Sequence, residues 1–217
     1  MRLAGRIGRS LGALLLALLC AGAADSLRDV LPPLPPAPSA HADDVLFADD
    51  FSGDLGHWQP DTPGVWSIRQ GMLRAELPDE RQRRSLIYAG DSTWTDYVLE
   101  FDVCMMRGVD KGAVVRAHDG RGLGVDLRGG AYQDVVAYAR AWRQGDAPAI
   151  NPDAAWNHVR IEVHGRRFRV WVNGDLRLDH ALTRTLHGRI ALAAYTGGTG
   201  RCTVYYDNVV VRTCPAP

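Results

Sequence analysis

The stretch Trp156-Asn-His-Val-Arg-Ile-Glu-Val-His-Gly165-Arg-Arg-Phe-Arg-Val-Trp-Val-Asn-Gly174 decides the fold class of this chain. Apolar and polar residues alternate along it, and this period of two is typical of strands with one buried and one exposed face. The alternation is interrupted at Gly165 and at Asn173-Gly174, where residues that tolerate positive φ allow a tight turn. The stretch therefore predicts an antiparallel pair of strands followed by a second hairpin turn.

The same period extends outward in both directions, and we find no convincing helix between residues 44 and 212. The runs are short, rich in β-branched and aromatic residues, and separated by Gly, Asp, Asn and Pro. They predict strands at residues 44–48, 65–69, 72–77, 84–88, 97–106, 112–118, 122–128, 134–142, 157–164, 167–173, 175–179, 188–195 and 202–212. Many short strands without helices predict an all-β sandwich or closed barrel, and about 170 residues suffice for a two-sheet core.

Alternation also assigns the two faces of the expected strands. Along residues 97–106, Leu99 and Phe101 fall on one face, and Glu100 and Asp102 fall on the other. The remaining inward positions on this strand and on the two strands of the opening stretch are Val103, Met105, Val159, Ile161, Val163, Phe168, Val170 and Val172. These apolar side chains are the predicted core.

Composition limits the classes of partner. The 217 residues include 25 basic and 25 acidic side chains and have no formal net charge. Because phosphate binding normally requires a basic excess or patch, this balance argues against a nucleic-acid partner. Apolar residues make up 46% of the chain, which is globular and too apolar for disorder.

The N-terminus has the pattern of an export signal. Three arginines precede an unbroken apolar run at residues 11–24, which is too short for a membrane-spanning helix of about 20 residues and fits a secretory signal. We expect a signal peptide at residues 1–24, although Ala40-His-Ala42 offers a cleavage site as late as residue 42. The protein is then secreted or periplasmic, with no membrane span after cleavage.

Residues 25–42 predict a linker between this signal and the folded domain. The segment contains Leu31-Pro-Pro-Leu-Pro-Pro-Ala-Pro-Ser39. Five prolines in so short a span cannot continue a helix or join the interior of a sheet, so an extended spacer is expected. The folded domain is then predicted at residues 43–214.

Several segments of this domain carry motifs in a fixed order. Asp49-Asp-Phe-Ser-Gly-Asp-Leu-Gly-His-Trp58 and Val65-Trp-Ser-Ile-Arg-Gln-Gly-Met-Leu73 come first, followed by residues 94–103, 112–116, 156–163 and 206–211. The ordered set resembles the concanavalin A-like lectin/glucanase superfamily, specifically its laminin-G-like and 3-keto-disaccharide-hydrolase-like jelly rolls. The resemblance covers nearly all of residues 43–212 and implies a two-sheet antiparallel β-sandwich. It does not define the function, because this fold hosts lectins, glycosidases and inert spacers.

The carboxylate pair of a glucanase is not found. Retaining glycosidases need two carboxyl groups about 5 Å apart. The family-16 glucanases of this superfamily carry E-x-D-x-x-E or E-x-D-x-E on one strand, and the matching strand here holds only Asp126. We therefore predict no catalytic residue. Cleavage of a 3-keto sugar stays open, because that chemistry need not use the same pair.

His158, Glu162 and His164 share one strand face and could approach a zinc ion together. The alternative is an ordinary solvent-facing strand, which is the more common meaning of such a pattern. We prefer the alternative.

A candidate binding face follows from alternation on three expected central strands. Its residues are Arg116, His118, Asp126, Arg128, Tyr138, Arg140 and Trp142. Aromatic faces stack on sugar rings, and charged groups fix hydroxyls by bidentate hydrogen bonds, so the set suits a carbohydrate. The alternative is a set of surface residues covered by a loop or joined in cross-strand ion pairs, because sequence alone does not establish strand adjacency.

The resemblance also implies a structural Ca²⁺ ion where the last strand meets the N-terminal segment. Asp207 matches the carboxylate ligand of the family, Gly71 matches a hairpin carbonyl, and the N-terminal donor falls near Phe47–Asp49. Carbonyls with one or two carboxylates can provide the six or more oxygens that Ca²⁺ needs. The alternative is an Asp207 carboxylate hydrogen-bonded to backbone amides.

Export makes disulfides possible, and three cysteines follow the predicted signal: Cys104, Cys202 and Cys214. In the family, the strand at residues 97–106 pairs with the last strand. This pairing would set Cys104 opposite Cys202 and implies a disulfide between them, with Cys214 free. Reduced, buried cysteines are the alternative.

Taken together, the residues and the resemblance predict an exported, non-catalytic carbohydrate-binding module with a glycan or polysaccharide as its partner. A glycoside-cleaving enzyme of the 3-keto-disaccharide-hydrolase-like type is one alternative, with Arg116, His118 and Asp126 as its plausible chemistry. A laminin-G-like module that binds a protein is the other.

Overall fold

A computed structural model describes residues 29–36, 44–138, 142–144 and 153–214, and for 142–144 it describes the backbone. Residue contacts divide the chain into two compact units, Met1–Val30 and Leu31–Pro217, and the second contains all of the described strands. Within the described residues, no helix is long and apolar enough to cross a membrane.

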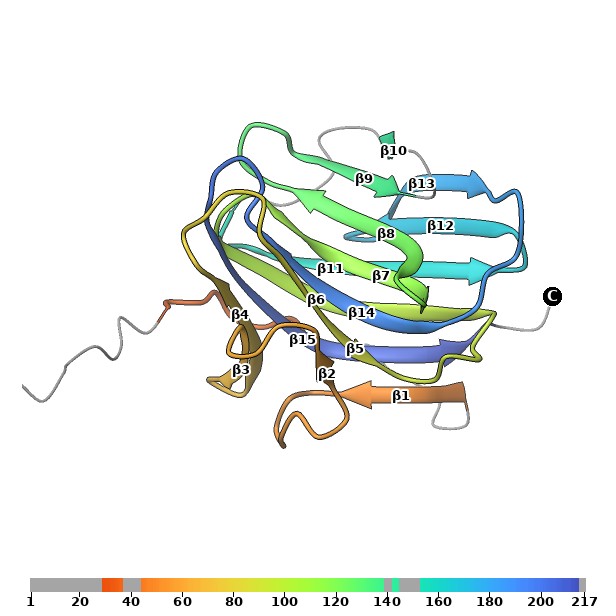
Figure 1. Ribbon diagram of the computed structural model, residues 1–217, viewed down its shortest axis with the longest axis horizontal. Coiled ribbons are helices and arrows are strands. Elements are labelled where there is room, and N and C mark those ends of the chain that lie inside the picture. Colours follow the sequence, from red (N-terminus) through yellow and green to blue (C-terminus); the bar gives the residue numbers. More distant parts are fainter. Residues whose placement is uncertain (1–28, 37–43, 139–141, 145–152, 215–217) are drawn as a thin grey trace, which may run out of the picture. The chain divides into compact units, whose positions relative to one another are not determined.

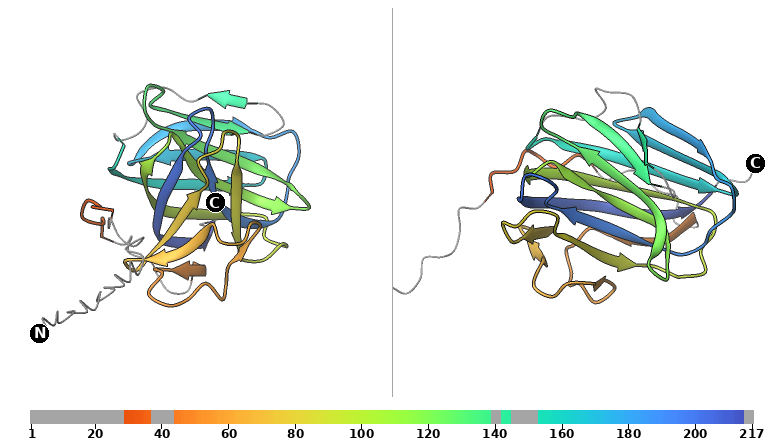
Figure 2. Two further views of the ribbon diagram at one scale, coloured as in Figure 1. Left: turned by 60° about the vertical axis from the view of Figure 1, so that its left-hand side comes forward. Right: turned by 45° about the horizontal axis from the view of Figure 1, so that its top comes forward.

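The unit is a sandwich of two antiparallel sheets (Figures 1 and 2). Sheet A has the order β13-β12-β11-β6-β15-β4-β3, with β1 paired to β15. Its strands are β1 (Val45–Asp49), β3 (Trp66–Arg69), β4 (Met72–Leu77), β6 (Tyr97–Arg107), β11 (Trp156–His164), β12 (Arg167–Val172), β13 (Asp175–Ala181) and β15 (Cys202–Thr213).

Sheet B has the order β10-β9-β8-β7-β14-β5-β2. Its strands are β2 (Gln59–Pro60), β5 (Arg84–Ala89), β7 (Asp110–His118), β8 (Arg121–Arg128), β9 (Asp134–Tyr138), β10 (Trp142–Gln144) and β14 (Arg189–Tyr195). The predicted two-sheet jelly roll is thus confirmed, and the barrel alternative is wrong.

Each expected strand corresponds to an observed one, with ends that agree within two residues, apart from the run 134–142. That run contains β9 and the first residue of β10, and residues 139–141 lie outside the described part. The two-residue strand β2 was not predicted, because a pair of residues that includes Pro60 shows no alternation.

The core lies between the inner faces of the sheets, where the predicted inward residues of β6, β11 and β12 are all buried. Both predicted turns are confirmed, since Asn173 and Gly174 have φ values of 54° and 88°, and Gly165 has 53°. Such turns match the twist of the strands they join, so the hairpins follow from local residue chemistry.

Bulges interrupt the ladders where the site-bearing strands run. The register of β7 against β8 shifts between Val115 and His118, and Arg116 has a positive φ of 50°. In β15 the register against β6 shifts near Thr203 and again between Asp207 and Val210, where Asn208 has φ 51°. A bulge turns the next side chain toward a different neighbour, so simple alternation fails at these points.

Candidate functional site

The outer face of sheet B forms a groove of about 1910 Å³. Its floor comes from alternate residues of β5, β14, β7, β8 and β9, and its rim includes residues 180–186 and the turn 118–121 between β7 and β8. The groove therefore opens on the face of the sandwich where the sequence placed the candidate binding surface.

Small residues on the outer face of sheet B leave space above the sheet in this groove. Ala193 and Gly112 are paired in the ladder, and Gly112 is paired in turn with Asp126. A Cβ atom on Gly112 would lie 1.9 Å from the carbonyl oxygen of Val125, so glycine is required there. At Gly124, by contrast, an added Cβ would meet only the Cβ of Tyr138, at 3.8 Å. The space above Gly124 is therefore open.

Two tyrosines flank this floor. Sheet register places one row of residues across five strands: Tyr88, Ala191, Val114, Gly124 and Tyr138. At about 4.8 Å per strand, Tyr88 and Tyr138 lie roughly 19 Å apart at the two ends of the row. Tyr138 is 44% exposed, and the Arg189 guanidinium lies 4.6 Å from the centre of the Tyr88 ring. The groove thus has aromatic surfaces at both sides.

Asp126 is the carboxyl group on the floor. Burial is the main cause that raises its pKa, to about 7, and the nearby Asp110 carboxylate adds to the rise while Arg84 and Arg128 oppose it. Asp110 and Asp126 occupy diagonal positions on β7 and β8, since their direct partners are Arg128 and Gly112. Asp126 can therefore exist as a neutral acid or as a carboxylate near neutral pH.

Of the seven predicted binding residues, the structure places His118, Asp126 and Tyr138 in the groove. Trp142 begins β10, whose backbone pairs with that of Tyr138. Arg140 lies outside the described residues.

His118 and Asp126 are not brought together. Asp126 faces Gly112, and His118 lies six residues further along β7, so the two are roughly 20 Å apart. A joint catalytic role for these two residues is therefore wrong.

The prediction that Arg116 belongs to the binding face is also wrong. The bulge in β7 turns this side chain away, and it is 1% exposed. Its guanidinium donates hydrogen bonds to the carbonyls of Thr95 (2.6 Å) and Gly165 (2.9 Å) and pairs with Asp96 (2.9 Å). Arg116 therefore ties the start of β6 to the β11–β12 turn.

Arg128 is likewise engaged elsewhere. It forms a bidentate ion pair with Asp134, at 2.7 and 2.5 Å, and it lies 4.5 Å from the centre of the Tyr132 ring. This is the cross-strand ion pair that the sequence left open as an alternative. The residue does not line the groove.

Sequence reasoning missed most of the basic and aromatic lining. The basic and aromatic residues it did not name include Arg84, Tyr88, Arg121, Arg184, Arg189 and Tyr195. A signal for two of them existed, because Arg84 and Tyr88 alternate with buried Ser85, Ile87 and Ala89 on β5. That strand was identified, but its place beside the central strands was not.

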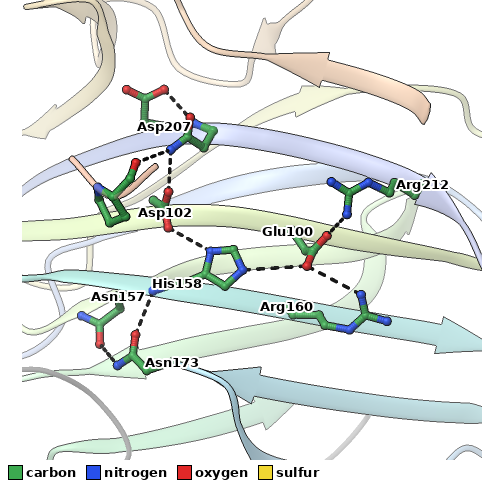
Figure 3. A network of polar contacts seen from close by, with 10 residues as sticks. Glu100, Asp102, Asn157, His158, Arg160, Asn173, Asp207 and Arg212 are labelled. Atoms are coloured by element: carbon green, nitrogen blue, oxygen red, sulfur yellow. Dashed lines mark hydrogen bonds and ion pairs between the residues drawn. The ribbon is translucent and has the colours of Figure 1, made fainter. Parts of the chain in front are cut away.

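The outer face of sheet A carries a different polar arrangement, shown in Figure 3. The Nδ1 atom of His158 lies 2.9 Å from Asp102, which is fully buried, and its Nε2 atom lies 3.8 Å from Glu100. Hydrogen bonding to Asp102 is the main cause that raises the pKa of His158 to about 9, and Glu100 adds to it. Within the described residues no three His, Cys, Asp or Glu side chains are grouped as metal ligands, so the zinc hypothesis gains no support.

Part of the predicted linker packs on this face. The indole N–H of Trp156 donates to the carbonyl of Pro32 at 2.9 Å, and the side-chain amide of Asn208 donates to the carbonyl of Pro35 at 3.2 Å. Leu31 also contacts the cluster of Cys104, Trp156 and Tyr205. The described residues 31–36 therefore belong to the compact unit, and the predicted boundary at residue 43 is too late for them.

The predicted disulfide is wrong. Cys104 and Cys202 are free, with Cys104 opposite Tyr205 on β15. The strands pair antiparallel as expected, but in a different register along the whole pair, since Tyr97 lies opposite Thr213 and Cys104 opposite Tyr205. In addition, Cys202 belongs to the main core whereas Cys104 packs with Trp156 on the outer face of sheet A, so the sheet separates the two thiols.

The residues predicted to hold calcium fit a hard cation in part. Asp207 is 3% exposed, and its carboxylate accepts one hydrogen bond, from the backbone N–H of Asn208. Burial, together with the charges of Asp102, Asp50 and Asp49, raises the pKa of Asp207 to about 6. A cation would offset this repulsion.

The other predicted ligands can contribute only in particular ways. The two carboxylate oxygens of Asp49 already accept hydrogen bonds from the Phe51 N–H (2.7 Å) and the Trp58 indole (2.8 Å). Gly71 occupies the β3–β4 turn with φ 74° and could offer only its backbone carbonyl. A cation at this place would therefore be held by the Asp207 carboxylate together with backbone carbonyls.

The fold defines a concanavalin A-like jelly roll with an open groove on one sheet. The chain belongs to the 3-keto-alpha-glucoside-1,2-lyase-like domain family, which it matches over residues 45–212. It is therefore a carbohydrate-binding or glycosidase-like jelly-roll module. A search of curated protein sequences finds no match.

Solved structures with the same fold have low sequence identity to this chain. The carbohydrate-binding module CBM66 from Bacillus subtilis is 15% identical with a TM-score of 0.56, over 72% of this chain and 96% of that one. A putative glycosyl hydrolase from Parabacteroides distasonis is 16% identical with a TM-score of 0.55, over 76% and 98%. An endo-β-galactosidase from Clostridium perfringens that releases GlcNAcα1-4Gal is 13% identical with a TM-score of 0.59, over 84% and 65%.

Proposed function

We propose that this protein binds carbohydrate non-catalytically in the groove of sheet B. The observation that carries the proposal is the row of residues across the floor, in which Tyr88 and Tyr138 lie on either side of Ala191, Val114 and Gly124. Tyrosine rings offer apolar faces to the C–H surfaces of a sugar, and the open floor leaves room for its rings. The family name and the carbohydrate-binding module among the structural neighbours support the same class of ligand.

A pair of glycine substitutions tests this proposal. Gly124→Phe fills the groove above an open position, whereas Gly53→Phe adds the same side chain to an exposed turn with nothing within 4 Å of its added Cβ. After a glycan array has identified a ligand, Gly124→Phe should weaken binding at least about 100-fold, which is roughly 2.7 kcal/mol. Gly53→Phe should bind like the wild type.

Both variants must remain folded for this comparison, and thermal denaturation checks that. Tyr138→Ala removes one aromatic side of the groove and should weaken binding about tenfold. A folded Gly124→Phe protein that binds the ligand with unchanged affinity would place the binding site elsewhere and refute the proposal.

A second candidate function is glycoside cleavage on the same face, and one observation favours it. The pKa of Asp126, raised to about 7 mainly by burial, suits a general acid or base at neutral pH. Asp126→Asn separates the two functions. Loss of product release with retained glycan binding would indicate an enzyme, and weaker binding without any turnover in the wild type would indicate a lectin-like module.

We also propose that a structural Ca²⁺ ion is bound by the Asp207 carboxylate together with backbone carbonyls, including that of Gly71. The burial of Asp207 and its acidic neighbours support this site. The signal-like pattern of residues 1–24 supports a secreted or periplasmic location, and a fusion of these residues to a reporter enzyme tests it.

A further inference from the structure

The groove of sheet B carries an excess of positive charge in a chain that has none overall. Four arginines line it, from β5, β8, β14 and the segment before β14: Arg84, Arg121, Arg184 and Arg189. Two carboxylates line it as well, Asp119 and Asp126. The excess of positive charge is therefore confined to the groove on the outer face of sheet B.

Three of these arginines are available to a ligand. Within the described part of the chain, the side chains of Arg84, Arg121 and Arg184 are exposed and form no hydrogen bond or ion pair. Several arginines outside the groove are paired with carboxylates, as Arg107 is with Asp79 at 2.8 Å and Arg160 with Glu162 at 3.0 Å. The three groove arginines are not held in this way.

The two acidic groups of the groove offset little of this charge. Asp119 lies 3.2 Å from the Nε2 atom of His118, so its charge is directed at that ring. Asp126 has a raised pKa and is only partly ionised near neutral pH. Among the described residues, neither carboxylate forms an ion pair with Arg121 or Arg184.

The arginines also define two ends of the groove. Arg189 pairs with Ala117 and Arg121 with His118, so these two arginines lie together at the β7–β8 turn. Arg84 pairs with Tyr195, six residues along β14 from Arg189. At about 3.3 Å per residue the two ends are roughly 20 Å apart, which a chain of several sugar rings would span.

We propose that the groove binds an acidic polysaccharide, with carboxylate or sulfate groups of the glycan paired to Arg121 at one end, to Arg84 at the other, and to Arg184 on the rim. The planar guanidinium groups suit both anions because they can donate two parallel hydrogen bonds to each. This inference rests on the proposed carbohydrate-binding function and specifies the class of glycan.

Matched pairs of polymers test the inference by titration calorimetry with the purified protein. Polygalacturonate is compared with its fully methyl-esterified form, and dextran sulfate with dextran, so that each pair differs in charge and shares a backbone. The acidic member of at least one pair should bind at least about tenfold more tightly at low ionic strength. Raising the salt from about 0.05 to 0.5 M should reduce that preference, because it shortens the screening length.

Single substitutions locate the effect. Arg121→Gln and Arg184→Gln should each lower the affinity for the acidic polymer about threefold to tenfold, and should lower the affinity for its neutral counterpart by a smaller factor. Arg69→Gln is the control, because Arg69 is exposed at the end of β3, on the other sheet. The polymer pair that responds identifies the anion as carboxylate or sulfate.

The possible failures are distinguishable. Neutral polymers that bind as tightly as acidic ones, with binding lost in Gly124→Phe, would overturn the inference and leave the carbohydrate-binding function standing. No binding to any polymer or arrayed glycan would overturn the function itself. An acidic preference that Arg69→Gln reduces as much as Arg121→Gln, or equal affinity for duplex DNA, would show non-specific charge attraction and overturn the inference.

Discussion

Replacing Asp102 by Asn tests the polar network on the outer face of sheet A. Asp102 is fully buried, lies 2.9 Å from the His158 ring and accepts a hydrogen bond from Asn208 at 2.7 Å. Asparagine has nearly the same shape and no charge, so the substitution removes the electrostatic partner of His158 with little change in packing. It should destabilise the fold, because a buried interaction with a charged group is lost.

The size of the effect follows from the pKa of His158, which the network raises from 6.5 to about 9. At 1.36 kcal/mol per pKa unit this corresponds to roughly 3 kcal/mol for Asp102 and Glu100 together, with Asp102 providing the largest part. His158 is 34% exposed, so solvent screening reduces the expected contribution to about 1–2 kcal/mol. In a domain of this size, that is a change in Tm of about 2–8 °C.

The shifted pKa of His158 also determines how the stability of the fold changes with pH. A histidine whose pKa is higher in the folded state than in the unfolded state stabilises the fold fully below pH 6.5. That stabilisation is lost as the pH rises through about 9. We therefore expect the stability difference between the wild type and Asp102→Asn to be largest near pH 6 and to shrink steadily toward pH 9.5.

Urea denaturation across this pH range measures the difference, with His158→Gln as a second variant that removes the titrating ring. Comparison with each variant cancels other titrating groups, including Asp126, whose pKa is about 7, and Cys214, whose pKa is about 11. A stability difference that stays constant from pH 6 to 9.5 would refute the role assigned to Asp102. So would an NMR resonance of His158 in the wild type that titrates near 6.5.

Three further predictions concern single sites. Arg116→Met leaves two carbonyls and the Asp96 carboxylate without their donor, so it should cost about 3–5 kcal/mol, or a Tm decrease of about 6–20 °C, without changing glycan affinity. Weaker glycan binding at an unchanged Tm would contradict this. Excess calcium should raise the Tm of the wild type by several degrees relative to its Tm in EDTA, and should not change the Tm of Asp207→Asn. Calorimetry measures both, and a wild-type Tm that is the same in calcium and in EDTA would exclude the proposed ion. Thiol titration of the unfolded, unreduced protein should find Cys104 and Cys202 both reactive, whereas a mass lower by two hydrogens would indicate a disulfide.

The sequence predicts the sandwich well because its signal is local and repeated. On β11, Val159, Ile161 and Val163 alternate with His158, Arg160 and Glu162, and a sheet with one face in the core requires that pattern. The turn at Asn173-Gly174 needs positive φ at both positions, which these two residue types adopt at low cost. Fold class and most strand ends therefore follow from nearest neighbours in the chain.

The site is less predictable because it depends on register between strands far apart in sequence. A bulge at Arg116 reverses the side of one residue, and that single change converts a presumed ligand contact into a buried structural arginine. The register of β15 against β6 similarly sets Cys104 opposite Tyr205, three residues from Cys202. The bulged residues of β7 include no glycine or proline, and alternation carries no information on which residues of two distant strands lie opposite each other, so the sequence reveals neither feature.

The two outer faces of the sandwich differ in how many of their charged side chains have partners within the protein, and this difference supports the binding site proposed on sheet B. On sheet A, Glu100 contacts Arg212 and His158, Glu162 contacts Arg160 and Arg169, and residues 31–36 contact part of the face. A ligand there would have to displace these internal partners. On sheet B, Arg84 and Arg121 have no such partners among the described residues, and the floor between them is lined by small side chains. Binding on sheet B would therefore disrupt few existing contacts of the protein, whereas binding on sheet A would disrupt many, and this supports the proposal that the ligand binds on sheet B.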